Sequence, residues 1–201
     1  RKPISMNTQP PVKKHFIVAM TGASGAIYGI TLLKLLQKMP DIETHLVISG
    51  AGSITLTHEM GMSVDQANEL ADHVYNVHNI SAAIASGSFT CEGMVIAPCS
   101  MRTLAAVAHG FCDNLITRSA DVTLKERRKL VLVPREAPLN LAHIRNMASV
   151  TEMGGIIYPP VPAFYNHPQI IDDLVGQTVR RILQLFNITD SQLAVWNGIT
   201  R

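Results

Sequence analysis

A short run of small residues, Gly22-Ala23-Ser24-Gly25, stands between two segments of different character. The apolar run 15–20 has the length of a β-strand, and residues 27–39 have the apolar spacing of an amphipathic helix. A βα turn of this kind presents backbone N–H groups to an anion. It therefore predicts a nucleotide phosphate as the first ligand to consider. The alternative is an ordinary βα turn whose small residues only allow close packing.

The same turn narrows the kind of nucleotide. A dinucleotide-binding turn has the spacing G-x-G-x-x-G, with an acidic residue for the ribose about 20 residues later. Here the next apolar run, 44–48, ends at Ser49 instead of at an acid. No G-x-x-x-x-G-K-[ST] sequence occurs, so a P-loop is excluded. These features favour a mononucleotide such as FMN over NAD.

Further polar residues follow the other apolar runs of the chain. They are Ser49, the Ser100-Met101-Arg102-Thr103 turn, Arg135 with Glu136, and Tyr165. In a parallel sheet the carboxyl ends of the strands meet at one edge, where open α/β folds bind ligands. We therefore expect one crevice lined by hydroxyls, arginines and a carboxylate.

The elements that must position these residues alternate along the chain. Apolar runs of strand length occupy 44–48, 94–97, 130–133 and 155–158, and helix-like segments occupy 53–60, 103–109, 139–149 and 172–186. Continuous apolar strands that alternate with helices are typical of a parallel sheet covered on both faces. The sequence predicts one doubly wound α/β domain over residues 15–201. Residues 1–14 are expected to be a flexible segment, and Arg1 to Ser5, which precede Met6, are interpreted as a cloning remnant.

The composition argues against several classes of function. A net charge of +2 provides no concentrated basic face for nucleic acid or an anionic membrane. No apolar stretch approaches the roughly 18 to 20 residues that span a bilayer, and no signal peptide is present, so a cytoplasmic location is expected. Three cysteines without C-x-x-C spacing suit a reduced protein. The eight histidines show no metal-binding spacing, so no metal site is predicted.

Taken together, the motifs resemble the UbiX-type flavin prenyltransferases over nearly the whole chain. The matching pieces are Thr21-Gly22-Ala23-Ser24-Gly25-Ala26, Ser86-Gly87-Ser88, Pro98-Cys99-Ser100 with Thr103, Ala120-Asp121-Val122, Leu124-Lys125-Glu126-Arg127-Arg128, Leu130-Val131-Leu132-Val133-Pro134-Arg135-Glu136 and Pro162-Ala163-Phe164-Tyr165. The resemblance implies a flavodoxin-like, Rossmann-like homo-oligomer, often a dodecamer, that uses no metal. It further implies transfer of the dimethylallyl group of dimethylallyl monophosphate to N5 and C6 of reduced FMN. The product, prenylated FMN, would serve UbiD-type decarboxylases, including the one in ubiquinone biosynthesis.

The resemblance also assigns an FMN site, residue by residue. It consists of Gly22, Ala23, Ser24, Ser49, Ser100, Met101, Arg102, Thr103 and Arg135. Helix N-termini and hydroxyl donors can bind a phosphate without a metal. Met101 and Arg102 match by position only, so we expect their backbone to make the contact. The chain departs from the family where it has Gly50-Ala51-Gly52 after Ser49, because the family usually continues as Ser-Lys-Ala.

For the prenyl donor, the resemblance assigns the phosphate to Tyr165 and Arg181. Further cations are Arg118 and Lys125, contributed by the same or a neighbouring subunit, and Trp196 is expected to cap the allyl pocket from a C-terminal tail. Three residues are predicted to be catalytic: Glu136, Glu59 and Ser24. A carboxylate in a largely apolar crevice can orient a substrate or carry a proton.

Two other functions stay open. The first is an FMN-dependent decarboxylase of cysteine peptides, although the chain has Pro98-Cys99-Ser100-Met101-Arg102-Thr103 where those enzymes have Pro-Ala-Ser-Ala-Asn-Thr. The second is a flavin-binding subunit without turnover, against which the presence of Glu136, Tyr165 and Arg181 together argues. A serine hydrolase is disfavoured, because Ala26 stands where a G-x-S-x-G elbow requires glycine.

Overall fold

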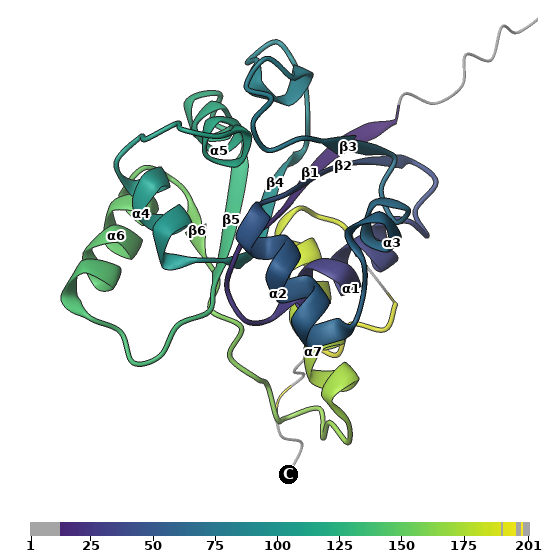
Figure 1. Ribbon diagram of the computed structural model, residues 1–201. Helices are drawn as coiled ribbons and strands as arrows, with labels where there is room; N and C mark the ends of the chain where they lie inside the picture. Colours follow the sequence, from purple (N-terminus) through teal and green to yellow (C-terminus); the bar gives the residue numbers. More distant parts are fainter. Residues whose placement is uncertain (1–12, 190, 196–197, 199–201) are drawn as a thin grey trace, which may run out of the picture.

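All strands in the described part of the chain run parallel in one sheet. The computed structural model describes residues 13–189, 191–195 and 198 (Figure 1). The strands are β1 (Lys14–Met20), β2 (Ile42–Ile48), β3 (His73–Tyr75), β4 (Gly93–Cys99), β5 (Lys129–Pro134) and β6 (Ile156–Ile157), and their order is β3-β2-β1-β4-β5-β6. This is the doubly wound parallel sheet that the sequence predicts.

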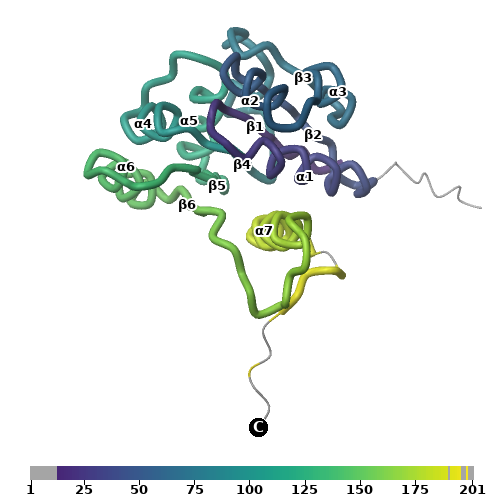
Figure 2. Tube along the Cα trace, turned by 60° about the horizontal axis from the view of Figure 1, so that its bottom comes forward, coloured from purple at the N-terminus to yellow at the C-terminus, as the bar shows by residue number. Residues whose placement is uncertain are grey.

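Helices cover both faces of the sheet (Figure 1). The helices are α1 (Ala26–Leu36), α2 (Gly50–Met60), α3 (Val64–Asn68), α4 (Met101–Ala108), α5 (Leu115–Lys125), α6 (Leu141–Glu152), α7 (Ile171–Leu185) and the short 3₁₀ helix η1 (Ala83–Ala85). Helices α1, α2, α3 and α7 pack on one face, and α4, α5, α6 and η1 pack on the other. Figure 2 shows α7 lying under the sheet beside α1.

Two apolar cores, one on each face, hold these layers together. Successive residues of a strand point to opposite faces, so Phe16 and Val18 of β1 enter the core with α1 and α7, whereas Ile17 and Ala19 enter the other. All four side chains are buried. Burying a large apolar side chain contributes about 1.5–3 kcal/mol, which explains why the central strands are apolar along their whole length.

Four elements of the structure were not predicted from the sequence. They are the short elements α3, β3 and η1, and the 11-residue helix α5. The three-residue strand β3 carries no buried residue, so it has no apolar run to reveal it. Helix α5 is amphipathic, and its start is marked by Asn114, whose side chain accepts a hydrogen bond from the Thr117 N–H. The predicted strands and helices are otherwise all present, with β1 beginning at Lys14, and residues 1–12 lie outside the described part.

The order in which the strands are added to the sheet changes side between β1 and β4. From β1 it proceeds to β2 and β3 by helices on one face, and from β4 it proceeds to β5 and β6 by helices on the other. The loops after β1 and β4 therefore diverge, and they leave a crevice between them at the carboxyl edge. The predicted polar residues Ser49, Ser100 to Thr103, Arg135 and Glu136 lie here, but Tyr165 does not, because the loop after β6 leads away toward α7.

Two glycines let the loop after β1 pack closely on α2. A Cβ atom on Gly22 would lie 2.4 Å from the Ala51 Cβ, and one on Gly52 would lie 2.6 Å from the Met20 carbonyl oxygen. Such distances are shorter than van der Waals contact, so neither position accepts a side chain without movement of the backbone. In Gly50-Ala51-Gly52, where the sequence departs from the family pattern, the packing therefore requires Gly52 but not Gly50.

A pair of substitutions in α2 tests this packing. We expect Gly52→Ala to lower the free energy of unfolding by about 1–3 kcal/mol, because the methyl group would overlap a backbone oxygen. Gly50→Ala is the matched control, since nothing lies within 4 Å of its Cβ position, and alanine should be neutral or slightly stabilising there. Urea unfolding followed by circular dichroism measures both. Equal effects of the two substitutions would contradict the packing argument.

Candidate functional site

The loops after β1, β2, β4 and β5 surround the crevice at the carboxyl edge of the sheet. The crevice consists of two adjoining clefts, of about 330 and 360 Å³, which share Gly22 and Ser100. The first is lined by Thr21, Gly22, Ser49, Ala51, Ser100, Arg102, Thr103, Asn114 and Ile116, and the second by Gly22, Ala23, Ser24, Ser100, Met101, Arg135, Glu136 and Ala137. The structure thus brings together every residue predicted for the FMN site, and it places Glu136 beside them.

Two serines begin the helices that point at this crevice. The Ser49 hydroxyl oxygen caps α2 by accepting a hydrogen bond from the Gly52 N–H at 3.0 Å. The Ser100 hydroxyl oxygen caps α4 by accepting one from the Thr103 N–H at 3.2 Å. Neither helix has an acidic residue in its first turn. The positive ends of both helix dipoles therefore face the crevice without an acidic residue in the helices' own first turns, which favours an anionic ligand.

A buried threonine that the sequence analysis did not select joins the two strands beneath the crevice. Thr21 is 2% exposed, and its hydroxyl donates to the Pro98 carbonyl oxygen at 2.9 Å and accepts from the Ser100 N–H at 2.8 Å. These bonds connect the end of β1 to the end of β4. The available signal was a hydroxyl residue directly after a buried strand.

Glu59 binds the N-terminus of α1 from the far end of α2. Its carboxylate oxygen accepts hydrogen bonds from the Gly25 N–H at 2.9 Å and the Ala26 N–H at 3.0 Å. In this structure the first N–H groups of α1 are therefore engaged by a side chain. This corrects the expectation that they are open to a phosphate. The helices whose N-cap residues line the crevice are instead α2, α4 and α5, capped by Ser49, Ser100 and Asn114.

The surroundings of Glu59 keep its carboxylate ionised. Partial burial alone would raise its pKa, but the hydrogen bonds from Ser24, Gly25 and Ala26 and the positive charge of Arg135 together hold the pKa below its ordinary value of 4.5. Ser24, which lines the second cleft, is thus joined to Glu59. The two residues predicted to be catalytic beside the turn form one hydrogen-bonded unit.

The Glu59 carboxylate should make the stability of the fold depend on pH. A carboxyl whose pKa is lower in the folded state stabilises the fold above the unfolded-state value of 4.5, and this contribution is lost as the pH falls through the lower folded-state pKa. We expect Glu59→Gln to be less stable than the original protein at pH 7, with a difference that shrinks below pH 4.5. Urea unfolding at a series of pH values measures this. Glu152→Gln, at the exposed end of α6, is the control and should show no such convergence.

Arg135 and Glu136 follow β5 on the rim of the second cleft. The Arg135 side chain lies against the 22–25 turn, since a Cβ on Gly25 would be 3.8 Å from the Arg135 Cγ. Burial raises the pKa of Tyr28 on α1, and the nearby positive charge of Arg135 opposes that rise. Glu136 accepts a hydrogen bond from the Ala137 N–H at 3.1 Å. Tyr28 is therefore a further aromatic neighbour of the site that the sequence analysis did not select.

Arg102 lines the first cleft, and its side chain is engaged by an acidic residue. Its guanidinium forms an ion pair with Asp113, which lies in the loop before α5. Because this guanidinium is already paired, a ligand contact through the backbone of Arg102 stays the prediction. The same loop contributes Asn114 to the lining of the first cleft, a residue that only its N-cap pattern could have indicated.

Tyr165 and Arg181 lie in a second group, beside α7. Tyr165 is in the loop after β6, and Arg181 is on α7. Burial raises the pKa of Tyr158, the charge of Arg181 lowers it, and Tyr165 raises it, so both residues lie near the Tyr158 hydroxyl. Neither is among the described residues that line the two clefts.

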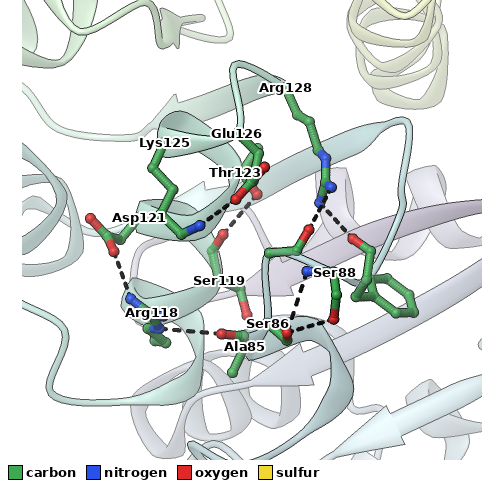
Figure 3. Close-up of polar contacts among 12 residues, drawn as sticks. Ala85, Ser86, Ser88, Arg118, Ser119, Asp121, Thr123, Lys125, Glu126 and Arg128 are labelled. Atoms are coloured by element: carbon green, nitrogen blue, oxygen red, sulfur yellow. Dashed lines mark hydrogen bonds and ion pairs between the residues drawn. The ribbon is translucent and has the colours of Figure 1, made fainter.

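Arg118 and Lys125 form a third group, on α5 (Figure 3). The Arg118 guanidinium donates to Asp121 at 2.9 Å and to the Ala85 carbonyl oxygen at 3.3 Å. The Lys125 ammonium group donates to Glu126, next to the loop 86–88. Helix α5 ends just before β5 begins, so Lys125 lies near the amino edge of the sheet, opposite to the crevice. Within one chain, Lys125 therefore lies away from the residues predicted for the FMN site.

The remaining predictions concern Trp196, metal binding and membrane spans. Trp196 lies outside the described residues. Within 13–189, 191–195 and 198, no group of three or more histidine, cysteine, aspartate or glutamate side chains is arranged to hold a metal ion. The helices of the described part include none that is both long and apolar enough to cross a membrane.

Comparison with known proteins gives consistent matches along the chain. The flavoprotein family matches residues 4–183. The chain is 53% identical over 186 residues to the flavin prenyltransferase UbiX of Neisseria meningitidis serogroup B, which covers 92% of this chain and 98% of that protein. A crystal structure of AnUbiX (PadA1) in complex with FMN and dimethylallyl pyrophosphate has a TM-score of 0.91 and 48% identity, covering 94% of this chain and 100% of that one. A dodecameric FMN-dependent UbiX-like decarboxylase from Escherichia coli O157:H7 has a TM-score of 0.90 and 47% identity, covering 92% and 100%.

Proposed function

Because the chain belongs to the UbiX-type flavin prenyltransferases, we propose that it transfers the dimethylallyl group of dimethylallyl monophosphate to N5 and C6 of reduced FMN. The observation that carries this proposal is the crevice, where all nine residues assigned to the flavin lie around two adjoining clefts. A related protein of known structure binds FMN and dimethylallyl pyrophosphate, which supports FMN as the acceptor and a dimethylallyl phosphate ester as the donor.

The residues of the crevice fit a flavin mononucleotide. The uncompensated N-termini of α2 and α4, with Ser49 and Ser100 at their caps, suit a phosphate. Gly22 keeps the floor of the crevice free of a side chain. Reduced FMN supplies the two nucleophilic ring atoms, N5 and C6, and Arg135 supplies a cation at the rim. Together these residues bind and orient the acceptor.

The residues that could transfer or accept protons lie in the second cleft. Glu136 lies on its rim, where a carboxylate can orient the donor phosphate or take a proton as the ring loses one. Glu59 stays anionic and accepts a hydrogen bond from the Ser24 hydroxyl, so it can hold that hydroxyl in one orientation. Ser24 itself lines the cleft. In this proposal Ser24 contacts the flavin edge, and Glu59 acts through it.

Departure of the donor phosphate requires fixed cations. Negative charge develops on the phosphate as the allylic C–O bond breaks, and preorganised donors lower the barrier to that step. We assign this role to Tyr165 and Arg181, with Arg118 and Lys125 of a neighbouring subunit. The position of Lys125 near the opposite edge of the sheet supports a contribution between subunits. A dodecameric relative supports an assembly of this kind, with twelve copies as the expected state.

The product, prenylated FMN, would be passed to a UbiD-type decarboxylase, in ubiquinone biosynthesis or in related decarboxylation of aromatic acids. The direct test of the proposed function is mass spectrometry of the flavin. The purified protein, given FMN, dithionite and dimethylallyl monophosphate, should yield a flavin heavier by one prenyl unit. A bound flavin of unchanged mass under these conditions would instead favour a flavin-binding subunit without turnover.

A further inference from the structure

A buried glutamine on α7 binds two segments that are far apart in the sequence. Gln177 is only 5% exposed. Its side-chain amide donates to the Ala194 carbonyl oxygen at 2.8 Å and accepts from the Ala194 N–H at 3.3 Å. The amide thus pairs with the backbone of residue 194 in both directions, as a neighbouring strand would. This arrangement fixes the C-terminal segment 191–195 against α7, and Figure 2 shows that segment folding back toward the loop before α7.

The same amide reaches a residue of the proposed donor site. Gln177 Nε2 lies 3.5 Å from the Tyr165 hydroxyl oxygen, a longer and weaker contact than those to Ala194. Arg181 follows Gln177 by four positions on α7, so the two side chains lie on the same face of the helix. Of the two residues assigned to the donor phosphate, Tyr165 thus contacts Gln177, and Arg181 lies one turn further along α7, where its guanidinium donates to the Gln184 side chain.

A second contact supports the attachment of the tail. Arg180 donates a hydrogen bond to the Gln192 side chain, one turn from Gln177 along α7. Between the tail, α7 and the loop 166–168 lies a cleft of about 340 Å³, which Gln177, Arg180, Gln192 and Ala194 help to line. The tail is thus held at two points along one helix.

We propose that Gln177 is a positioning residue that fixes the C-terminal segment and the Tyr165 phenol to one face of α7, and so sets the geometry of the prenyl-donor site. The proposal rests on the proposed function for the identity of the donor. The buried amide is costly unless all of its polar atoms are bonded, and Ala194 satisfies both its oxygen and its nitrogen. Removing the amide should therefore release the tail and loosen Tyr165 without changing the core of the fold.

The test compares Gln177→Leu with Thr178→Val in the FMN-loaded protein. Leucine has a similar volume and no hydrogen-bonding group. Thr178 is the matched control, because it is similarly buried and, among the described residues, its hydroxyl bonds to Leu174 within its own helix. In Gln177→Leu, hydrogen exchange at Ala194 and the KM for dimethylallyl monophosphate should each rise about tenfold, as expected for the loss of one or two net hydrogen bonds. The kcat, the affinity for FMN and exchange in β1 should stay as they are, and Thr178→Val should change none of these quantities.

Three results would overturn the proposal. They are unchanged exchange at Ala194, faster exchange with an unchanged KM, and the same response in Thr178→Val. Gln177→Met provides a second variant if leucine prevents folding, since its unbranched side chain follows the path of glutamine and has no amide, and it should give the same rises in exchange and KM. If the original protein shows no prenyl transfer, the proposed function fails, and exchange at Ala194 alone decides whether Gln177 fixes the tail.

Discussion

Mixed particles of Lys125→Met and Glu136→Gln subunits should transfer the prenyl group, although particles of either variant alone should not. Each substitution removes one charged group from the proposed site, and we expect a loss of about 100-fold or more in kcat for each. The structure separates the two residues within a chain, because Glu136 lies on the crevice and Lys125 lies near the opposite edge of the sheet. A complete site would then need Glu136 from one subunit and Lys125 from another.

The measurement uses co-expressed subunits that carry different affinity tags, with purification on both. Random mixing in a symmetric assembly should give about a quarter of the sites both original residues, and activity should recover in that proportion. The matched control mixes Glu136→Gln with Arg135→Met, because these residues are adjacent in one loop and every site would lack one of them. Absence of recovery in the first mixture would show that Lys125 does not act across the subunit boundary.

Replacing Tyr165 by phenylalanine and Arg181 by alanine together should weaken donor binding by about 100-fold. The double variant removes one hydroxyl donor and one guanidinium from the proposed phosphate site, and hydrogen bonds to a charged group are worth about 1.5–3 kcal/mol each. FMN affinity should change little, because neither residue is among the described residues that line the two clefts.

Isothermal titration calorimetry with FMN, followed by titration of dimethylallyl monophosphate into the loaded protein, separates the two affinities. The double variant Tyr75→Phe with Arg145→Ala is the control, since these residues lie on β3 and α6, outside the three groups of predicted site residues. An equal loss of FMN and donor affinity in the Tyr165 and Arg181 variant would remove both residues from the donor site.

The sequence predicts the framework of this fold well because its strands are buried on both faces. Such strands appear as uninterrupted apolar runs, and the polar residues that follow them are then placed at one edge by topology alone. This reasoning gathers Gly22, Ser49, Ser100 and Arg135 around the crevice, where the structure places them. It fails for β3, which is short and unburied, and for α5, whose apolar residues are interrupted by charged ones.

Contacts between distant segments are the part that the sequence does not predict. The partner of the α1 N-terminus is Glu59, which lies 34 residues from Gly25 along the chain. The Gln177 side chain binds the backbone N–H and carbonyl groups of Ala194, and every residue has these groups, so the identity of residue 194 does not reveal the contact. The distance between Lys125 and the crevice depends on the direction in which α5 returns across the sheet. Each of these features follows from packing in three dimensions and has no local pattern.

The hydrogen bonds of Thr21 have a consequence for how the site is filled and emptied. They connect the base of the crevice to the ends of the two central strands, so we expect that base to keep one shape when a ligand binds. The entropic cost of ordering it is met during folding and does not reduce affinity at each binding event. Release of prenylated FMN and binding of a new FMN would then require movement only at the rim. A rigid base of this kind would suit an enzyme whose product leaves the site unchanged.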